Sequence, residues 1–382
     1  MPQNDRTELL YRIALTMAPA IGPITARKLI DKVGSARAVF DQKRELLEKI
    51  EGIGPRMSQS FNASTLLGQA EKEIAFLERY HISALYFEDP EYPQRLNQCA
   101  DGPILLYTRG EEGLKCRRSL SVVGTRRATS YGRDHCKAIV SGLASMLNDL
   151  VIVSGLAYGI DVIAHRAALG SGIPTVAVLG HGMSTIYPQS HRDTAKKIIG
   201  QGALVTDFHS KMGPERNNFL RRNRIIAGLS DATLVIESAK TGGALITAVL
   251  ASSYGRDVLA VPGRTSDERS KGCNGLIKSN LAALVESPDD VISHLNWEDH
   301  PQTQAKTATP ELFPSEDEKQ LLQLIQEIPG IVSETLSHNT GIPIHKVLSQ
   351  LMEMELKQWI SVEPGNRYHT RISGALYNCS HS

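Results

Sequence analysis

The sequence predicts an α/β fold, a doubly wound, Rossmann-like parallel sheet between two smaller domains. Six short apolar runs alternate with helical segments between residues 119 and 263. Apolar runs without polar alternation indicate strands covered on both faces, and right-handed crossovers wind them into such a sheet. A Gly-rich helical stretch precedes this region, and three helices with a hairpin follow it. We therefore predict domains at 1–80, 81–296 and 317–382, with a linker at 297–316.

The first 80 residues predict a small helical domain of the helix-hairpin-helix, or SAM-like, type. "EGIG" at 51–54 is expected to form a turn between helices, and a looser copy surrounds Gly22. Paired glycines permit a tight turn and leave backbone N–H groups open to a phosphate. A helical packing domain without a ligand would carry the same turns, so both interpretations stay open.

The central domain supplies the strands and helices of the sheet in alternation. Strands are predicted at 119–124, 150–155, 174–180, 203–207, 232–238 and 257–263. Helices are predicted at 131–147, 159–169, 190–199, 219–230 and 242–255. Ligands of open parallel sheets bind beyond the carboxyl ends of the strands, so function is expected in the loops there.

The C-terminal region predicts a winged-helix domain. Residues 297–316 are polar and proline-rich without periodicity, which is typical of a linker. Helical stretches follow at 317–328, 333–341 and 343–358, and residues 359–372 form two β runs around a Pro-Gly-Asn turn. Three helices and a hairpin are the elements of a winged helix.

Composition indicates a cytoplasmic protein without a membrane segment. The five cysteines have no CxxC spacing, which argues against a zinc site and a disulfide framework. The first residues mix acids and arginine into an apolar stretch, unlike a signal peptide, and no apolar run approaches the roughly 20 residues of a membrane helix. The formal net charge is +1, so any basic surface must be local.

Glycine or small residues follow the predicted strands, where helix N-termini and backbone N–H groups can bind anions. These turns are Gly124-Thr125-Arg126-Arg127, Ser154-Gly155, Gly180-His181-Gly182, Thr241-Gly242-Gly243 and Pro262-Gly263. Each turn alone is a weak signal, since any strand-to-helix connection can use glycine. Together with neighbouring arginines, they predict an anion-binding edge.

Two basic segments are predicted to lie at this carboxyl edge. Residues 115–133 hold Lys115, Arg117, Arg118, Arg126, Arg127 and Arg133 without an acid, and residues 211–224 hold Lys211, Arg216, Arg221, Arg222 and Arg224 against one glutamate. Contacts at several phosphates of a polyanion fit this pattern better than one small acid. Some arginines, Arg224 foremost, are expected to pair with Asp161, Asp207 or Glu237 instead. Phe219, beside these arginines, is a candidate to stack on a base.

No catalytic constellation, cofactor motif or metal site is predicted. The sequence lacks G-x-x-x-x-G-K-[ST], a complete G-x-G-x-x-G and G-x-S-x-G, which argues against nucleotide hydrolysis, NAD binding and a serine nucleophile. His165 lies within a predicted helix and is interpreted as a packed histidine.

The motifs "SVVGTRRATSYG", "SGLAYGIDVIAHRAAL", "TVAVLGHGMSTIYP", "NNFLRRNRIIAGLS" and "LVIESAKTGGALITA" resemble those of the DNA-processing protein A (DprA/Smf) family, in order across the sheet domain. The resemblance implies a non-enzymatic protein that binds single-stranded DNA, protects incoming DNA in natural transformation and loads the RecA recombinase as a homodimer. It departs at His181 and Ser184, where the family often has Gly-x-Gly-x-Asp, and at Asp207-Phe208, where Ser-Glu is common.

The resemblance and the basic segments together give the expected DNA-binding residues. The set is Arg126, Arg127, Ser154, Gly155, Phe219, Arg221, Arg222, Asn223, Arg224, Gly242 and Gly243.

Two alternatives remain open. A nucleoside-monophosphate phosphoribohydrolase on the same fold would need a glutamate where Val249 stands, and Leu245-Ile246 replaces its Gly-Thr. A winged-helix regulator would need a basic recognition helix, yet residues 343–358 hold only Lys346 and Lys357 against two glutamates. A protein-contact or auxiliary DNA role fits that domain better.

Overall fold

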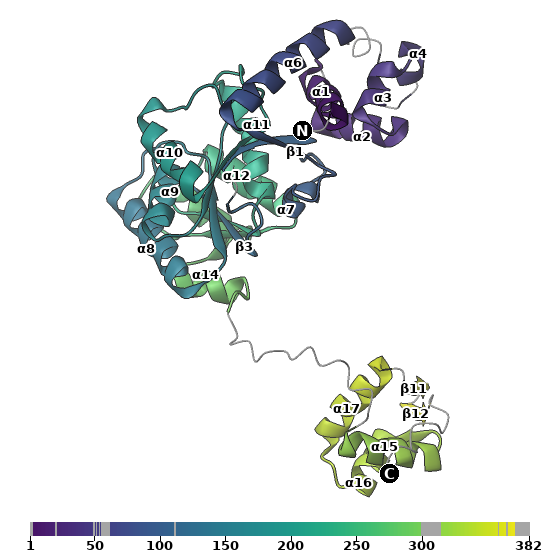
Figure 1. Cartoon of the computed structure of the whole chain (residues 1–382). Coiled ribbons are helices and arrows are strands. Elements are labelled where there is room, and N and C mark those ends of the chain that lie inside the picture. The colour runs from purple at the N-terminus through teal and green to yellow at the C-terminus, as the bar shows by residue number, and fades with distance from the viewer. Residues whose placement is uncertain are drawn as a thin grey trace. The chain divides into compact units, whose positions relative to one another are not determined.

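The computed structural model describes residues 3–19, 21–48, 50, 52, 54, 62–110, 112–298, 315–357, 359–363 and 366–370. The chain forms two compact units, Met1–Asp299 and His300–Ser382 (Figure 1), each with its own hydrophobic core.

The larger unit is built on a sheet with the order β1-β2-β6-β5-β4-β3-β7-β8-β9 within the described residues. The strands are β1 (Ser83–Tyr86), β2 (Leu105–Arg109), β3 (Arg118–Val123), β4 (Leu150–Ser154), β5 (Thr175–Val178), β6 (Gly202–Thr206), β7 (Ala232–Val235), β8 (Asp257–Ala260) and β9 (Ala283–Leu284). Strands β3 to β9 pair in parallel, whereas β1 and β2 are antiparallel to their neighbours. The predicted doubly wound parallel sheet is confirmed, and three edge strands extend it.

Helices cover both faces of the sheet (Figure 1). One face packs α8 (Ser130–Met146), α9 (Ile160–Gly170), α10 (Arg192–Gln201) and α14 (Pro288–His294). The other packs α7 (Gln94–Asn97), α11 (Arg216–Gly228), α12 (Gly243–Ser253) and α13 (Lys271–Lys278). Successive strand residues point to opposite faces, so Val122 joins the first core and Val123 the second.

The winding reverses between β3 and β7. From β3 the chain proceeds outward through β4, β5 and β6, then crosses to β7 on the other side of β3 and continues to β8 and β9. At such a reversal the connections leave in opposite directions and open a crevice beyond the carboxyl ends of the two strands.

The N-terminal helices pack on the antiparallel edge of this sheet. They are α1 (Gln3–Met17), α2 (Pro23–Val33), α3 (Ala36–Asp41), α4 (Arg44–Leu47) and α6 (Ala63–Tyr80). Their core is continuous with Tyr86 of β1 and with Leu105 and Tyr107 of β2. Gly22 is the N-cap of α2, with Pro23 in the first helical position. The turn expected at 51–54 lies partly outside the described residues.

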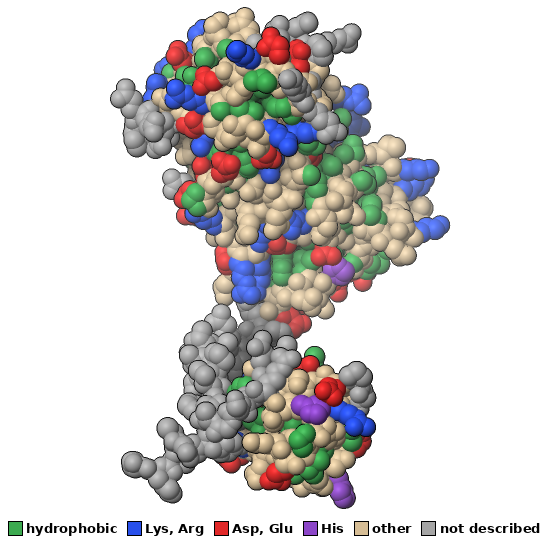
Figure 2. All heavy atoms as spheres, turned by 90° about the vertical axis from the view of Figure 1, so that its right-hand side faces the viewer, with side chains coloured by type: hydrophobic (Ala, Val, Ile, Leu, Met, Phe, Trp, Pro, Cys, Tyr) green, Lys and Arg blue, Asp and Glu red, His purple; other side chains and the backbone are tan. Residues whose placement is uncertain are grey.

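Charged side chains of both signs are interspersed over these helices on the face shown in Figure 2. On this face, the Lys and Arg side chains do not gather into one continuous basic patch, which agrees with the formal net charge of +1.

The smaller unit is a winged helix, as predicted. Its elements are α15 (Glu316–Glu327), β10 (Ile331–Val332), α16 (Ser333–Thr340), α17 (Ile344–Leu356), β11 (Ile360–Glu363) and β12 (Arg367–Thr370), with the sheet order β10-β12-β11. Ser315 and Glu318 cap the start of α15 reciprocally. Residues 364 and 365, at the tip of the predicted hairpin, lie outside the described part of the chain.

Trp297, at the start of the predicted linker, packs against the core of the larger unit. Residues 299–314 of that linker lie outside the described residues. Among the helices that the structure describes, none has the length and apolarity to cross a membrane.

Candidate nucleic-acid interface

A cavity of about 1010 Å³ lies beyond the carboxyl ends of β3 and β7. The loops after these strands and the helices α11 and α12 form its walls. Of the expected DNA-binding residues, the structure brings together here Arg126, Phe219, Arg222, Asn223, Gly242 and Gly243.

Helix α11 forms one wall because of its residue spacing. Arg216, Phe219, Arg222, Asn223 and Ile226 recur every three or four residues and line the cavity. Its N-cap, Glu215, makes no side-chain capping bond, and its first turn holds no acid. Because the Glu215 carboxylate does not cap the first N–H groups and Arg216 stands in the first turn, the N-terminus of α11 favours an anion at this wall.

Phe219 is surrounded by cations and by a second aromatic ring. The guanidinium carbon of Arg126 lies 5.6 Å from the ring centroid, and that of Arg222 lies 5.9 Å from it. The ring of Tyr187 lies 5.7 Å away at 46°. A Cβ at Gly180 would lie 2.7 Å from a Phe219 ring carbon, so any residue larger than glycine would force the ring to shift.

Arg222 is an internal anchor as well as part of the cavity wall. Its side chain is almost fully buried, at 3% exposure, and donates to the carbonyl oxygens of Gly155, at 2.7 Å, and Val178. These carbonyls end β4 and β5. Its Nε has no partner among the described residues. Burial lowers the pKa of Arg222 to about 10, so the guanidinium is charged at neutral pH.

Gly155 serves this anchor rather than the open cavity. A Cβ there would lie 2.2 Å from a terminal nitrogen of Arg222, far inside contact distance. Gly155 does not line the cavity, and its assignment to DNA stays a prediction.

The cavity carries more positive than negative charge. Arg126, Arg216 and Lys240 are exposed and line it together with Arg222, whereas Asp161 is the acidic residue in its wall. Burial raises the pKa of Asp161, and the nearby Arg222 opposes that rise. The balance favours a ligand with several negative charges.

The N-terminus of α12 points into the same cavity. Gly242 is its N-cap and makes no side-chain capping bond, and Thr241, Gly242 and Gly243 are exposed. The first backbone N–H groups of a helix lack partners within the helix and attract anions. Asn223 fixes this terminus by donating from Nδ2 to the Gly243 carbonyl oxygen at 3.3 Å.

The structure places the other expected residues outside the cavity. Ser154 is fully buried and donates its hydroxyl to the Val122 carbonyl oxygen at 2.6 Å. Arg127 is exposed beyond the cavity wall. Arg221 and Arg224 do not line the cavity. Because a helix turns about 100° per residue, Arg221 lies about half a turn around α11 from the middle of its cavity-lining residues.

Those two arginines have other contacts. The Arg221 guanidinium lies 5.1 Å from the Phe208 ring centroid. Arg224 pairs with Asp207 and donates to the Asp101 carbonyl oxygen, so the expected internal partner of Arg224 is found. Glu237 instead accepts from the Thr129 N–H and hydroxyl at 2.9 Å each, at the start of α8.

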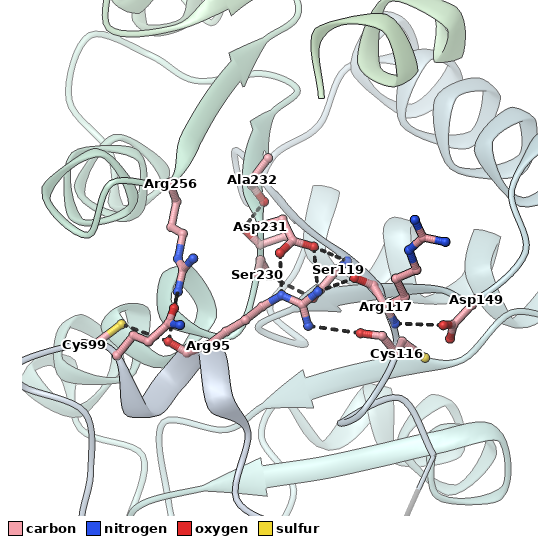
Figure 3. A network of polar contacts seen from close by, with 12 residues as sticks. Arg95, Cys99, Cys116, Arg117, Ser119, Asp149, Ser230, Asp231, Ala232 and Arg256 are labelled. Atoms are coloured by element: carbon pink, nitrogen blue, oxygen red, sulfur yellow. Dashed lines mark hydrogen bonds and ion pairs between the residues drawn. The ribbon is translucent and has the colours of Figure 1, made fainter. Parts of the chain in front are cut away.

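The expectation that residues 115–118 lie at the carboxyl edge is wrong. Lys115 and Arg117 precede β3, and Arg118 begins it, so they lie at the opposite, amino edge. There Arg95 and Asp231 point toward one another, and Asp231 accepts from the Ser119 N–H at 2.8 Å (Figure 3). The Arg117 N–H donates to Asp149 at 2.9 Å (Figure 3). This network ties the strand starts together.

His181 positions Tyr187, a role that the sequence did not predict. Its Nε2 accepts from the Tyr187 N–H at 3.2 Å, so Nδ1 carries the proton that is donated to the Gly182 carbonyl oxygen at 2.9 Å. Burial lowers the pKa of His181, which favours this neutral form. The departure from the family pattern in this loop therefore supports the aromatic wall of the cavity.

His165 is a packed histidine. The Thr175 hydroxyl donates to the Ile152 carbonyl oxygen at 2.7 Å and accepts from His165 Nδ1 at 2.7 Å. Burial, together with the charges of Arg222 and His191, lowers the pKa of His165 to about 3. An imidazole of such low basicity is a poor general base at neutral pH.

Lys240, Thr241 and Tyr187 line the cavity without having been assigned to DNA from sequence. Their positions in the sequence could have indicated this. Lys240 and Thr241 directly precede the paired glycines, and Tyr187 follows the third strand of the predicted sheet.

Comparison with known families matches both units of the chain. The family model described as DNA recombination-mediator protein A matches residues 83–296, and that of the DprA winged helix domain matches residues 302–366.

Relatives match over most of the chain. It is 34% identical over 327 residues to protein Smf of Escherichia coli K12, covering 84% of this chain and 86% of that protein. It is 36% identical over 235 residues to DNA processing protein DprA of Streptococcus pneumoniae R6, covering 58% of this chain and 82% of that protein.

Two solved structures are similar to this one. The X-ray structure of DprA from Streptococcus pneumoniae has a TM-score of 0.62 and 30% identity, covering 74% of this chain and 97% of that chain. A structure of DprA from Helicobacter pylori, described for its single-stranded DNA binding mode, has a TM-score of 0.51 and 28% identity, covering 57% and 97%. By its sheet, its winged helix and these matches, the chain belongs to the DNA recombination-mediator protein A family, DprA/Smf.

Proposed function

We propose that this chain binds single-stranded DNA in the cavity at β3 and β7 and breaks no bond in it. The observation that carries the proposal is the Phe219 ring in the cavity wall, with the guanidinium carbons of Arg126 and Arg222 at 5.6 Å and 5.9 Å from its centroid. Unpaired nucleotides offer a base that can stack on this ring and a phosphate that can contact the exposed Arg126, whereas bases in a duplex are already stacked.

Each part of the wall has a role in this proposal. Arg126, Arg216 and Lys240 are exposed and contact phosphates, and the N-terminus of α12 donates backbone N–H bonds to one of them. Phe219 and Tyr187 stack with bases. Arg222 contributes positive charge from its buried position in the cavity wall, where it donates to the carbonyl oxygens at the ends of β4 and β5.

The relatives support the wider role. The Helicobacter pylori relative is described as binding single-stranded DNA. We propose that this chain, as the family resemblance implies, acts in the cytoplasm as a homodimer that protects incoming DNA and loads RecA onto it. A dimeric mass by light scattering and faster RecA assembly on DNA coated with this protein are the expected results. A monomeric mass would contradict the homodimer, and an unchanged rate of RecA assembly would contradict the loading of RecA.

A nucleotide-hydrolysing function fits the cavity less well. Val249, at the position of the glutamate expected of a phosphoribohydrolase, is 55% exposed on α12 and does not line the cavity. Asp161 is a carboxylate in the wall, and its buried position beside Arg222 gives it a structural role. Incubation with AMP is expected to release no adenine, and release of adenine would favour the hydrolase.

Single-stranded DNA is expected to bind more tightly than duplex of the same length. Labelled oligo-dT and a matched duplex are titrated with the full chain by fluorescence anisotropy, and the recovered oligonucleotide is checked for intact length. Base stacking, at about 1–3 kcal/mol per base, is available only to the single strand and gives at least a roughly fivefold preference. Equal affinities, or a shortened oligonucleotide, would contradict the proposal.

A further inference from the structure

A second groove of about 610 Å³ lies beside the cavity, between the end of α6, the end of β2 and α10. Its lining combines aromatic rings with cations, the same two side-chain classes that line the cavity. None of the residues that line the cavity lines this groove.

The aromatic part is formed by the last turns of α6. Phe76 and Tyr80 are four residues apart, so they lie on one face of the helix, and their ring centroids are 4.6 Å apart. Phe76 is partly buried against the N-terminal core, whereas Tyr80 is 39% exposed. Arg79 lies 5.5 Å from the Tyr80 ring centroid. Core packing thus fixes Phe76 and leaves Tyr80 presented to solvent.

The cationic part comes from β2 and α10. Arg109 ends β2, and Arg192 and Lys196 lie one turn apart on α10. Neither Arg109 nor Arg192 has an ion-pair partner among the described residues, and Lys196 approaches exposed Asp193 only to 3.9 Å. The charges at this groove are therefore available to a ligand that carries anions.

The groove and the cavity meet at one loop. Ile186 lines the groove and Tyr187, the next residue, lines the cavity. Ser184 holds this loop by donating to the Ser210 carbonyl oxygen at 2.6 Å, and His181 holds its other end. A DNA strand that leaves the cavity past Tyr187 therefore reaches the groove along this loop, which hydrogen bonds hold at both ends.

We propose that the groove binds the continuation of the same single strand, with Tyr80 stacking on a base and Arg109 and Arg192 contacting phosphates. The proposal rests on the function proposed for the cavity. A polymer with a base and a phosphate at every repeat matches alternating rings and guanidinium groups in both places, and the shared loop supplies the path between them.

Oligonucleotide length separates the two sites. Tyr80→Ala, Tyr80→Phe and Arg192→Ala are titrated with oligo-dT of about 6 and about 20 nucleotides, lengths that bracket the usual single-strand site sizes. The matched control is Lys197→Ala, which removes an exposed charge from α10 outside the groove. Circular dichroism checks the fold of each variant.

With the long oligonucleotide, Tyr80→Ala is expected to lose about tenfold in affinity at an unchanged salt slope, while Tyr80→Phe retains affinity. Arg192→Ala is expected to reduce the steepness of the negative slope of log K against log[salt] by about 0.7. With the short oligonucleotide, each variant should bind as the wild type does.

Three results would overturn the inference. In the first, both alanine variants bind the long oligonucleotide as tightly as the wild type, while Arg126→Ala binds it weakly. The function proposed for the cavity would then stand, and the groove would have no part in it. Equal losses with the short oligonucleotide would show that the groove is not an extension. Failure of the wild type to bind either length would reject the proposed function together with this inference.

Discussion

Arg222→Ala is expected to lower the free energy of unfolding by about 3 kcal/mol. The change leaves the carbonyl oxygens of Gly155 and Val178 buried without a donor, and each such loss costs about 1–3 kcal/mol. It also removes the cation nearest to buried Asp161. Chemical denaturation followed by circular dichroism measures the loss.

Arg221→Ala is the matched control for this prediction. Arg221 is the preceding residue of α11 and is exposed, so its removal should change stability by no more than about 0.5 kcal/mol. Equal denaturation midpoints for Arg222→Ala and the wild type would show that this guanidinium does not anchor β4 and β5. Where the Arg222 variant stays folded, its affinity for oligo-dT should also fall.

Phe219→Ala is expected to weaken oligo-dT binding by about 1–3 kcal/mol, roughly five- to a hundredfold. The change removes the aromatic ring beside Arg126 and Arg222, so the bases lose their stacking surface while the phosphate contacts remain. The salt slope should therefore stay at the wild-type value. Anisotropy titrations at several salt concentrations give both quantities.

Phe219→Tyr is the control, because it keeps a ring of nearly the same shape next to Gly180. It should bind close to the wild-type affinity. If Phe219→Ala bound oligo-dT as tightly as the wild type, Phe219 would be a packing residue and stacking would have to be assigned elsewhere.

The sequence predicted the centre of the sheet better than its edges. Strands β3 to β8 are buried on both faces and appear as short apolar runs between helices. Strands β1 and β2 pair antiparallel and take their packing partner from the N-terminal helices, a long-range contact with no local signal. Strand β9 has only two residues, too few for periodicity.

The candidate site was predictable in location but not residue by residue. Loop glycines and arginines identified the carboxyl edge, and helical spacing separates Arg222 from Arg221 and Arg224 once the phase of α11 is set by Phe219. The anchor role of Arg222 depends on carbonyls from two other strands, which no local pattern reveals. The sequence places residues 115–118 at the wrong edge of the sheet. The basic segment 115–133 runs through β3, so its two ends lie at opposite edges.

The central claim is that one edge of this sheet contacts the phosphates of single-stranded DNA. The most direct measurement is the salt dependence of oligo-dT affinity for Arg126→Ala beside Arg127→Ala. Arg126 lines the cavity and its neighbour does not, although both are exposed. The negative slope of log K against log[salt] should become less steep by about 0.7 for Arg126→Ala and stay at the wild-type value for Arg127→Ala. Equal slopes for Arg126→Ala and the wild type would contradict the claim.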